Sequence, residues 1–246
     1  MVRGVDEKMK LSIAINLWMN DYIKAVQEQF GDRIWFVGLQ GSYGRGEATD
    51  TSDIDVVLIL DELSPRDVDS YSRLLDTLPN REMVCGFLSG KEEIEAWEKS
   101  DLFQFCYDTT PIIGSLESLM QTITPDDVMR AVKIGACNIY HACVHNLLHE
   151  KSVEILKSLY KSSRFVCQAI VYLQTGNYEK QQKKLTELLK SEERVIIENR
   201  QRLNNMDDIL SEDFTRLSDT LIQWASAWIV KSKVCTTCRK PQGIFL

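Results

Sequence analysis

The stretch Gly38–Leu60, GLQGSYGRGEATDTSDIDVVLIL, decides the fold of this chain. Two short apolar runs rich in strand-forming residues, Ile34–Leu39 and Ile54–Leu60, lie on either side of its polar centre. Gly41 has no Cβ, so the backbone can approach a ligand closely there. Ser42 offers a hydroxyl and backbone N–H groups where a short helical segment begins, and such positions favour phosphate. The stretch therefore predicts a strand, a phosphate-binding turn and a second strand.

Two carboxylates, Asp53 and Asp55, stand at the start of the second apolar run. Alternation along a strand places both on one face, with their Cα atoms about 6.5–7 Å apart. Two neighbouring carboxylates repel each other unless a cation compensates, and Mg²⁺ commonly takes one or two carboxylates together with substrate phosphates. Arg45, one turn after Ser42, is a candidate for a charge-assisted contact with the same phosphates. The pattern predicts one or two Mg²⁺ ions and ATP or another nucleoside triphosphate as co-substrate.

Joined as G-S-x10-D-x-D, these residues resemble the signature of the nucleotidyltransferase superfamily, which includes DNA polymerase β and the antibiotic nucleotidyltransferases. Either half alone is uninformative, since a lone Asp-x-Asp is usually a turn or a strand entry. The order of an α/β half before a helical half is similar to that of the aminoglycoside adenylyltransferases. The resemblance implies that Ser42 holds the triphosphate and that Asp53 and Asp55 hold Mg²⁺.

The resemblance also implies a third carboxylate on a following strand. Glu82 is the candidate, because the pair Arg81-Glu82 resembles the one that opens the corresponding strand in the aminoglycoside adenylyltransferases. Its role would be that of a catalytic general base for the acceptor hydroxyl, with metal contact. The alternative is that Glu82 is a solvated acid at the end of a strand, in which case Glu92, Glu93 and Asp108 are the other candidates for the third carboxylate.

The two halves of the chain differ in pattern, which predicts two domains. The first, over 1–123, alternates extended and helical periods and is expected to be an α/β (α+β) nucleotidyltransferase domain with a small mixed sheet. Its strands are expected over 34–39, 54–60, 82–88 and 102–107, and its helices over 6–29, 65–75 and 89–99. The second, over 124–246, shows only helical periods, roughly 125–149, 152–173, 178–203 and 211–232. It is expected to be an all-α helical bundle that closes over the substrate or the nucleotide.

Basic residues of the helical half are candidates for a contact with the triphosphate. Lys161 lies beside apolar residues in the middle of one expected helix, and Lys183 follows the break that Gly176 makes. Both are predicted as nucleotide-binding residues. The alternative is that they belong to solvated helix faces.

Two further motifs leave their roles open. His141, His145 and His149 recur at i, i+4 and i+8 of one expected helix, a spacing that suits a transition metal but is also typical of a polar helix face. Cys235 and Cys238 form half of a zinc motif without a partner pair, so they indicate a feature of the tail.

Composition limits the partners. The net charge is −7, with 22 acidic and 11 basic residues in 1–122 against 14 and 18 in the remainder. This balance makes nucleic acid an unexpected partner. No apolar run approaches the ~20 residues of a membrane span, and seven scattered Cys fit a reducing compartment, so a cytoplasmic location is expected. Oligomeric state stays open.

The sequence as a whole predicts a Mg-dependent enzyme that moves a nucleoside monophosphate, AMP from ATP, to a hydroxyl of a small acceptor and releases pyrophosphate. The acidic first half favours a cationic acceptor such as an aminoglycoside-type antibiotic. The alternative is an antitoxin-like interaction protein, or a protein-modifying nucleotidyltransferase, paired with a separate helical partner. The helical half lacks the Arg-x4-His motif of the toxins that accompany such proteins, so a fused toxin is not expected.

Overall fold

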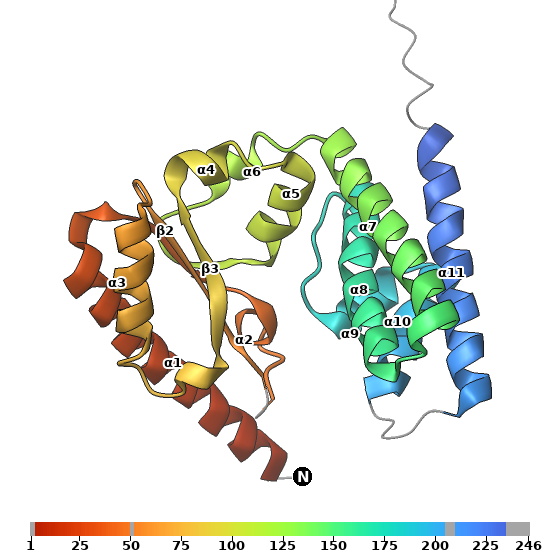
Figure 1. Ribbon diagram of the computed structural model, residues 1–246, viewed down its shortest axis with the longest axis horizontal. Helices are drawn as coiled ribbons and strands as arrows, with labels where there is room; N and C mark the ends of the chain where they lie inside the picture. Colours follow the sequence, from red (N-terminus) through yellow and green to blue (C-terminus); the bar gives the residue numbers. More distant parts are fainter. Residues whose placement is uncertain (1–2, 50–51, 205–209, 235–246) are drawn as a thin grey trace, which may run out of the picture. The chain divides into compact units, whose positions relative to one another are not determined.

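A computed structural model describes residues 3–49, 52–204 and 210–234 (Figure 1). The chain divides into two compact units, with the boundary between Ile123 and Thr124. Within the described residues, no helix has both the length and the apolar character needed to cross a membrane.

The first unit is built on a four-stranded sheet with the strand order β3-β2-β1-β4. The second strand runs antiparallel to β1 and parallel to β3, and β4 runs antiparallel to β1, so the expected small mixed sheet is confirmed. The strands are β1 (Ile34–Leu39), β2 (Ile54–Leu60), β3 (Val84–Gly90) and β4 (Thr110–Ile113). The helices are α1 (Arg3–Phe30), η1 (Gly31–Arg33), α2 (Gly41–Arg45), α3 (Pro65–Leu75), η2 (Arg81–Met83), α4 (Lys91–Glu95), α5 (Lys99–Asp108) and α6 (Glu117–Met120).

Each face of this sheet has its own apolar core. Ile54, Val56 and Leu58 of β2 pack with α1 and α3, whereas Val57 and Ile59 pack with α4, α5 and α6. The alternation follows from the period of two in a strand. This alternation places Asp55 on the same face as Val57 and Ile59, which is the face covered by α5.

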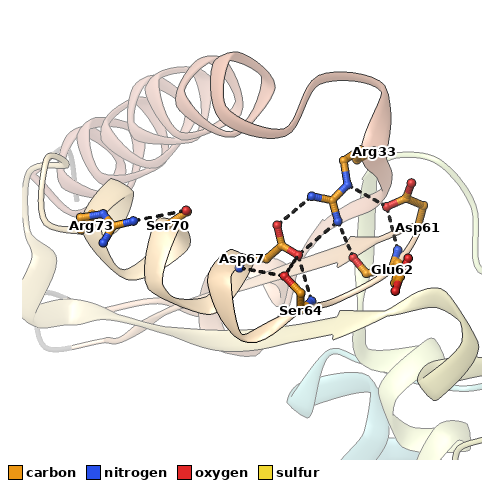
Figure 2. Close-up of polar contacts among 7 residues, drawn as sticks. All are labelled: Arg33, Asp61, Glu62, Ser64, Asp67, Ser70 and Arg73. Atoms are coloured by element: carbon orange, nitrogen blue, oxygen red, sulfur yellow. Dashed lines mark hydrogen bonds and ion pairs between the residues drawn. The ribbon is translucent and has the colours of Figure 1, made fainter.

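Arg33 joins the start of β1 to the start of α3 (Figure 2). Its guanidinium donates to Asp67 Oδ1 at 2.7 Å, to Asp61 Oδ1 at 3.2 Å and to the carbonyl of Glu62 at 2.7 Å. Asp67 also completes the capping box of α3 with Ser64, the N-cap residue. The hydrogen bonds from Arg33 and then from Ser64 hold the pKa of the Asp67 carboxyl well below its usual range.

The low pKa of Asp67 predicts an acid-sensitive contribution to stability. Because the folded pKa lies below the unfolded value of about 4, the contribution is complete above pH 4 and is lost as the pH falls toward the folded pKa. Asp67→Asn should therefore lower the free energy of unfolding by about 1–2 kcal/mol at pH 7, and by less at pH 2, where the folded carboxyl approaches its own pKa. Urea unfolding at the two pH values measures this difference.

Asp76→Asn is the control, because Asp76 pairs with Arg81 at 3.0 Å on the surface and such pairs contribute little. An equal loss at pH 7 and pH 2 for Asp67→Asn would show that the charge of Asp67 is not what stabilises the helix start.

The second unit is a helical bundle, as expected from its continuous helical periods. It comprises α7 (Pro125–His145), one π-helical turn η3 (Asn146–Glu150), α8 (Val153–Thr175), α9 (Gln182–Leu188), α10 (Ser191–Asn204) and α11 (Ser211–Val234). The first of these begins at a capping box between Thr124 and Asp127 with Pro125 at the first position. α7 packs against α8 and α11, and α10 packs against α8.

Three element predictions are wrong. Residues 102–107, expected as a strand, lie inside α5, where Leu102, Phe103 and Cys106 are buried at helical spacing. The fourth strand is Thr110–Ile113 instead. The helix expected over 89–99 is shorter, since β3 continues to Gly90 and α4 covers Lys91–Glu95. The helix expected over 178–203 is two helices, because Leu189 is extended between α9 and α10.

Candidate active site

The site begins where β1 ends. Gln40, the N-cap of the short helix α2, donates its backbone N–H to the carbonyl of Asp55 at 2.8 Å, which extends the pairing of β1 with β2 by one bond. Gly41 then takes φ +65, a left-handed conformation that favours glycine. The first amides of a helix have no partner inside the helix, so those of Ser42 and its neighbours are suited to a ligand.

The carboxylate of Asp55 lies against Gly41. A Cβ at Gly41 would stand only 1.8 Å from Asp55 Oδ2, so only glycine fits beneath this side chain. Asp55 is half-buried, and Asp53 is exposed at the entrance to β2. The structure therefore brings Gly41 of the expected phosphate turn into direct contact with Asp55, the second residue of β2.

Arg45 makes contacts other than the expected one. Its Nη1 donates to Asp108 Oδ2 at 2.9 Å and its Nε to Glu47 Oε2 at 3.3 Å, and its side chain is only 9% exposed. The guanidinium is thus held by two carboxylates of the protein. A direct contact between Arg45 and a triphosphate stays a prediction.

Glu82 does not begin a strand. It lies exposed in η2, the turn that precedes β3, and the strand starts two residues later at Val84. In the parallel pair of β2 and β3, Asp55 is opposite Cys85. In the part of the chain that the structure describes, no three His, Cys, Asp or Glu side chains lie close enough together to hold a metal ion. A role for Glu82 as general base or third ligand stays a prediction, and the strand position beside Asp55 carries a thiol.

Cys85 is exposed, whereas Cys106 on the same side of the sheet is buried. Burial raises the pKa of the Cys106 thiol to about 12, so Cys106 is inert as a nucleophile or metal ligand. Cys85 was not singled out from the sequence, because a lone cysteine in a strand carries no motif. Only the strand register shows that it lies next to Asp55.

The predicted lysines belong to the second unit. Lys161 is exposed on α8 and Lys183 is exposed on α9. Their contact with a nucleotide stays a prediction.

The three histidines form an exposed row along α7 and the π-helical turn. The ring centroids of His141 and His145 are 6.5 Å apart, and those of His145 and His149 are 4.7 Å apart. No third ligand joins any pair of them within the described residues. Cys235 and Cys238 lie outside the described residues.

The chemistry of the donor set fits Mg²⁺ bound together with a triphosphate. Asp53 and Asp55 carry hard oxygen ligands, and because Gly41 has no Cβ, the carboxylate of Asp55 lies beside the phosphate turn. Two carboxylates leave most of the octahedral positions of Mg²⁺ to phosphate oxygens and water. The arrangement can therefore hold a metal–triphosphate complex in which the nucleotide completes the metal site.

Comparisons with known proteins agree with this geometry. Residues 19–120 match the family model described as a nucleotidyltransferase domain. Over 72 residues, the chain is 33% identical to the candidate protein adenylyltransferase MJ1305 of Methanocaldococcus jannaschii; the match spans 29% of this chain and about half (46%) of the relative.

The fold is also similar to that of the spectinomycin adenyltransferase AAD(9) from Enterococcus faecialis, whose crystal structure contains ATP and spectinomycin. The TM-score is 0.56 at 15% identity, and the match covers 86% of this chain and 99% of the other. At this identity the likeness concerns the fold, and it extends through both units.

Proposed function

We propose that this chain is a nucleotidyltransferase, as the match of residues 19–120 to the nucleotidyltransferase domain supports, and that it transfers AMP from ATP to a hydroxyl group of a small acceptor. The acceptor oxygen forms a bond to the α-phosphorus, the bond from that phosphorus to the β-phosphate oxygen breaks, and pyrophosphate leaves. The acceptor hydroxyl gives its proton to a base, for which Glu82 is the candidate.

One observation carries the proposal, namely the contact between Asp55 and Gly41. It places a carboxylate beside the turn that offers Ser42 and backbone amides to phosphate oxygens. Asp53 and Asp55 would hold Mg²⁺, which when bound neutralises charge on the phosphates and on the leaving pyrophosphate. Ser42 would donate its hydroxyl to a phosphate oxygen and so orient the triphosphate.

Charge and fold both support the proposed type of acceptor. The first half of the chain has twice as many acidic as basic residues, 22 against 11, which favours a cationic acceptor. The similar fold of a spectinomycin adenyltransferase supports an aminoglycoside-type antibiotic. Lys161 and Lys183 are proposed as further contacts of the triphosphate, and the cytoplasmic location expected from the sequence is part of the same proposal.

A second candidate is transfer of AMP to a hydroxyl of a protein. It is favoured by the identity of 33% with MJ1305, which is named for that activity. This candidate shares the nucleotide site and differs only in the acceptor.

A pyrophosphate-release assay with ATP and Mg²⁺ tests the proposal. The full chain is screened against pooled aminoglycosides, spectinomycin, lincosamides and small metabolites, with ATP labelled at the α-phosphate to identify the product. Acceptor-dependent release of pyrophosphate supports the proposal, and label found only on a protein supports the second candidate. Release of the γ-phosphate instead of pyrophosphate would contradict both.

A further inference from the structure

Three consecutive residues at the junction of α5 and β4 contact the segment that follows β1. Asp108 Oδ2 accepts from Arg45 Nη1 at 2.9 Å. Thr109 Oγ1 accepts from Gln40 Nε2 at 2.6 Å, and Thr110 Oγ1 donates to the carbonyl of Gly44 at 3.0 Å. We call Asp108, Thr109 and Thr110 the brace. Its members lie more than 60 residues from their partners, so these contacts join separate parts of the first unit.

Two of the three residues of the brace are shielded from water, whereas Thr110 is exposed. Asp108 is 6% exposed and Thr109 is 3% exposed. An ion pair or hydrogen bond with low exposure is weakly screened and keeps a defined geometry. Thr109 is itself fixed, because its hydroxyl donates to the carbonyl of Phe105 one turn earlier in α5 at 2.5 Å. Asp108 and Thr109 therefore form a rigid support rather than surface contacts.

The supported segment is the one that contacts Asp55. Gln40 is bound from both sides, since its backbone N–H donates to the carbonyl of Asp55 and its side chain donates to Thr109. The next residue, Gly41, lies under the Asp55 carboxylate with no space for a Cβ. A shift of this segment would change the distance from Ser42 to the two aspartates.

We infer that Asp108 and Thr109 are positioning residues, which hold Gly41 and Ser42 in register with Asp55 and thereby set the affinity of the site for the triphosphate. The inference rests on the proposed function, and it assigns to the pair of Arg45 and Asp108 a role that needs no contact with the nucleotide. Breaking the brace loosens the phosphate turn before the nucleotide binds. The nucleotide then has to order this turn on binding, so its affinity falls while the bound state stays competent.

Kinetics of Asp108→Asn and Thr109→Val test the inference. Each should raise the KM for ATP about tenfold and change kcat less than about threefold, because the turn adopts the same geometry once ATP is bound. Thr109→Ser keeps the hydroxyl and should restore the KM of the wild type.

Two variants control for a loss of stability alone. Asp67→Asn removes a carboxylate from another ion pair of the same unit, and Thr122→Val removes a hydroxyl that donates to the carbonyl of Leu119 at 2.7 Å. Both should leave the KM for ATP unchanged. Unchanged KM values in Asp108→Asn and Thr109→Val, or the same increase in the two controls, would overturn the inference.

Hydrogen–deuterium exchange separates this inference from the proposed function. Without any nucleotide, the amides of residues 40–46 should exchange faster in Asp108→Asn and Thr109→Val than in the wild type and in Thr122→Val. Equal exchange would overturn the brace even if the chain proves to be an active transferase. If the wild type fails to bind a non-hydrolysable ATP analogue, the proposed function fails, and the exchange measurement still decides whether the brace holds the turn.

Discussion

Asp53→Asn and Asp55→Asn are each expected to lower nucleotide transfer about a thousandfold while the fold remains intact. Asparagine keeps the shape of the side chain but removes the charge that compensates a divalent cation. Loss of metal support for the leaving pyrophosphate corresponds to several kcal/mol, or about three orders of magnitude in rate. Thermal unfolding should be unchanged or shifted slightly upward, since the substitution removes a repulsion between two neighbouring carboxylates.

The matched control is Asp69→Asn, which makes the same change in charge at an exposed position of α3. It should keep full activity. Transfer rates within a few-fold of the wild type in both Asp53→Asn and Asp55→Asn would contradict the assignment of the metal ligands.

Gly41→Ala is expected to have the second large effect, and Gly46→Ala isolates its cause. Both glycines have positive φ, +65 and +70, so alanine is strained at both and costs about 1 kcal/mol in each. A Cβ at Gly46 meets nothing within 4 Å, whereas a Cβ at Gly41 would overlap Asp55 Oδ2 at 1.8 Å. Only Gly41→Ala must displace the carboxylate or the turn.

Activity should therefore fall about a hundredfold in Gly41→Ala and only a few-fold in Gly46→Ala, because a displacement near 1 Å can change rates by two orders of magnitude. Steady-state kinetics and urea unfolding of the two variants measure this. Equal losses of activity would show that the backbone strain matters and that the contact between Gly41 and Asp55 does not.

The central strands could be predicted from sequence, whereas the elements at the edge could not. Both β1 and β2 are apolar runs bounded by glycine, serine and aspartate, so their type and limits were clear. The run Leu102–Tyr107 is short and apolar, and such a run is compatible with a strand or a buried helix. The true fourth strand contains Pro111, which argues against a strand except at a sheet edge, where it lies.

Residues for a candidate site could be proposed from the sequence, but their contacts could not. The spacing of Gly41, Ser42, Asp53 and Asp55 predicts residues for binding metal and phosphate. This is possible because both motifs lie within one strand–turn–strand unit. The partner of Arg45 could not be found in this way, since Asp108 is 63 residues away and lies in a segment that was expected to follow a strand. The positions of Cys85 and Glu82 relative to Asp55 depend on where β3 begins. The turn η2 delays that start by two residues compared with the prediction.

Binding of Mn²⁺ in the presence of α,β-methylene ATP, followed by electron paramagnetic resonance, tests the central claim most directly. This analogue cannot release pyrophosphate, so the measurement needs no acceptor. One or two Mn²⁺ ions should bind tightly only when the nucleotide is present. In Asp53→Asn and in Asp55→Asn, the binding of Mn²⁺ and the binding of the nucleotide should be lost together. Tight, nucleotide-dependent binding of Mn²⁺ that persists in both variants would show that the metal and the triphosphate do not meet at these two carboxylates.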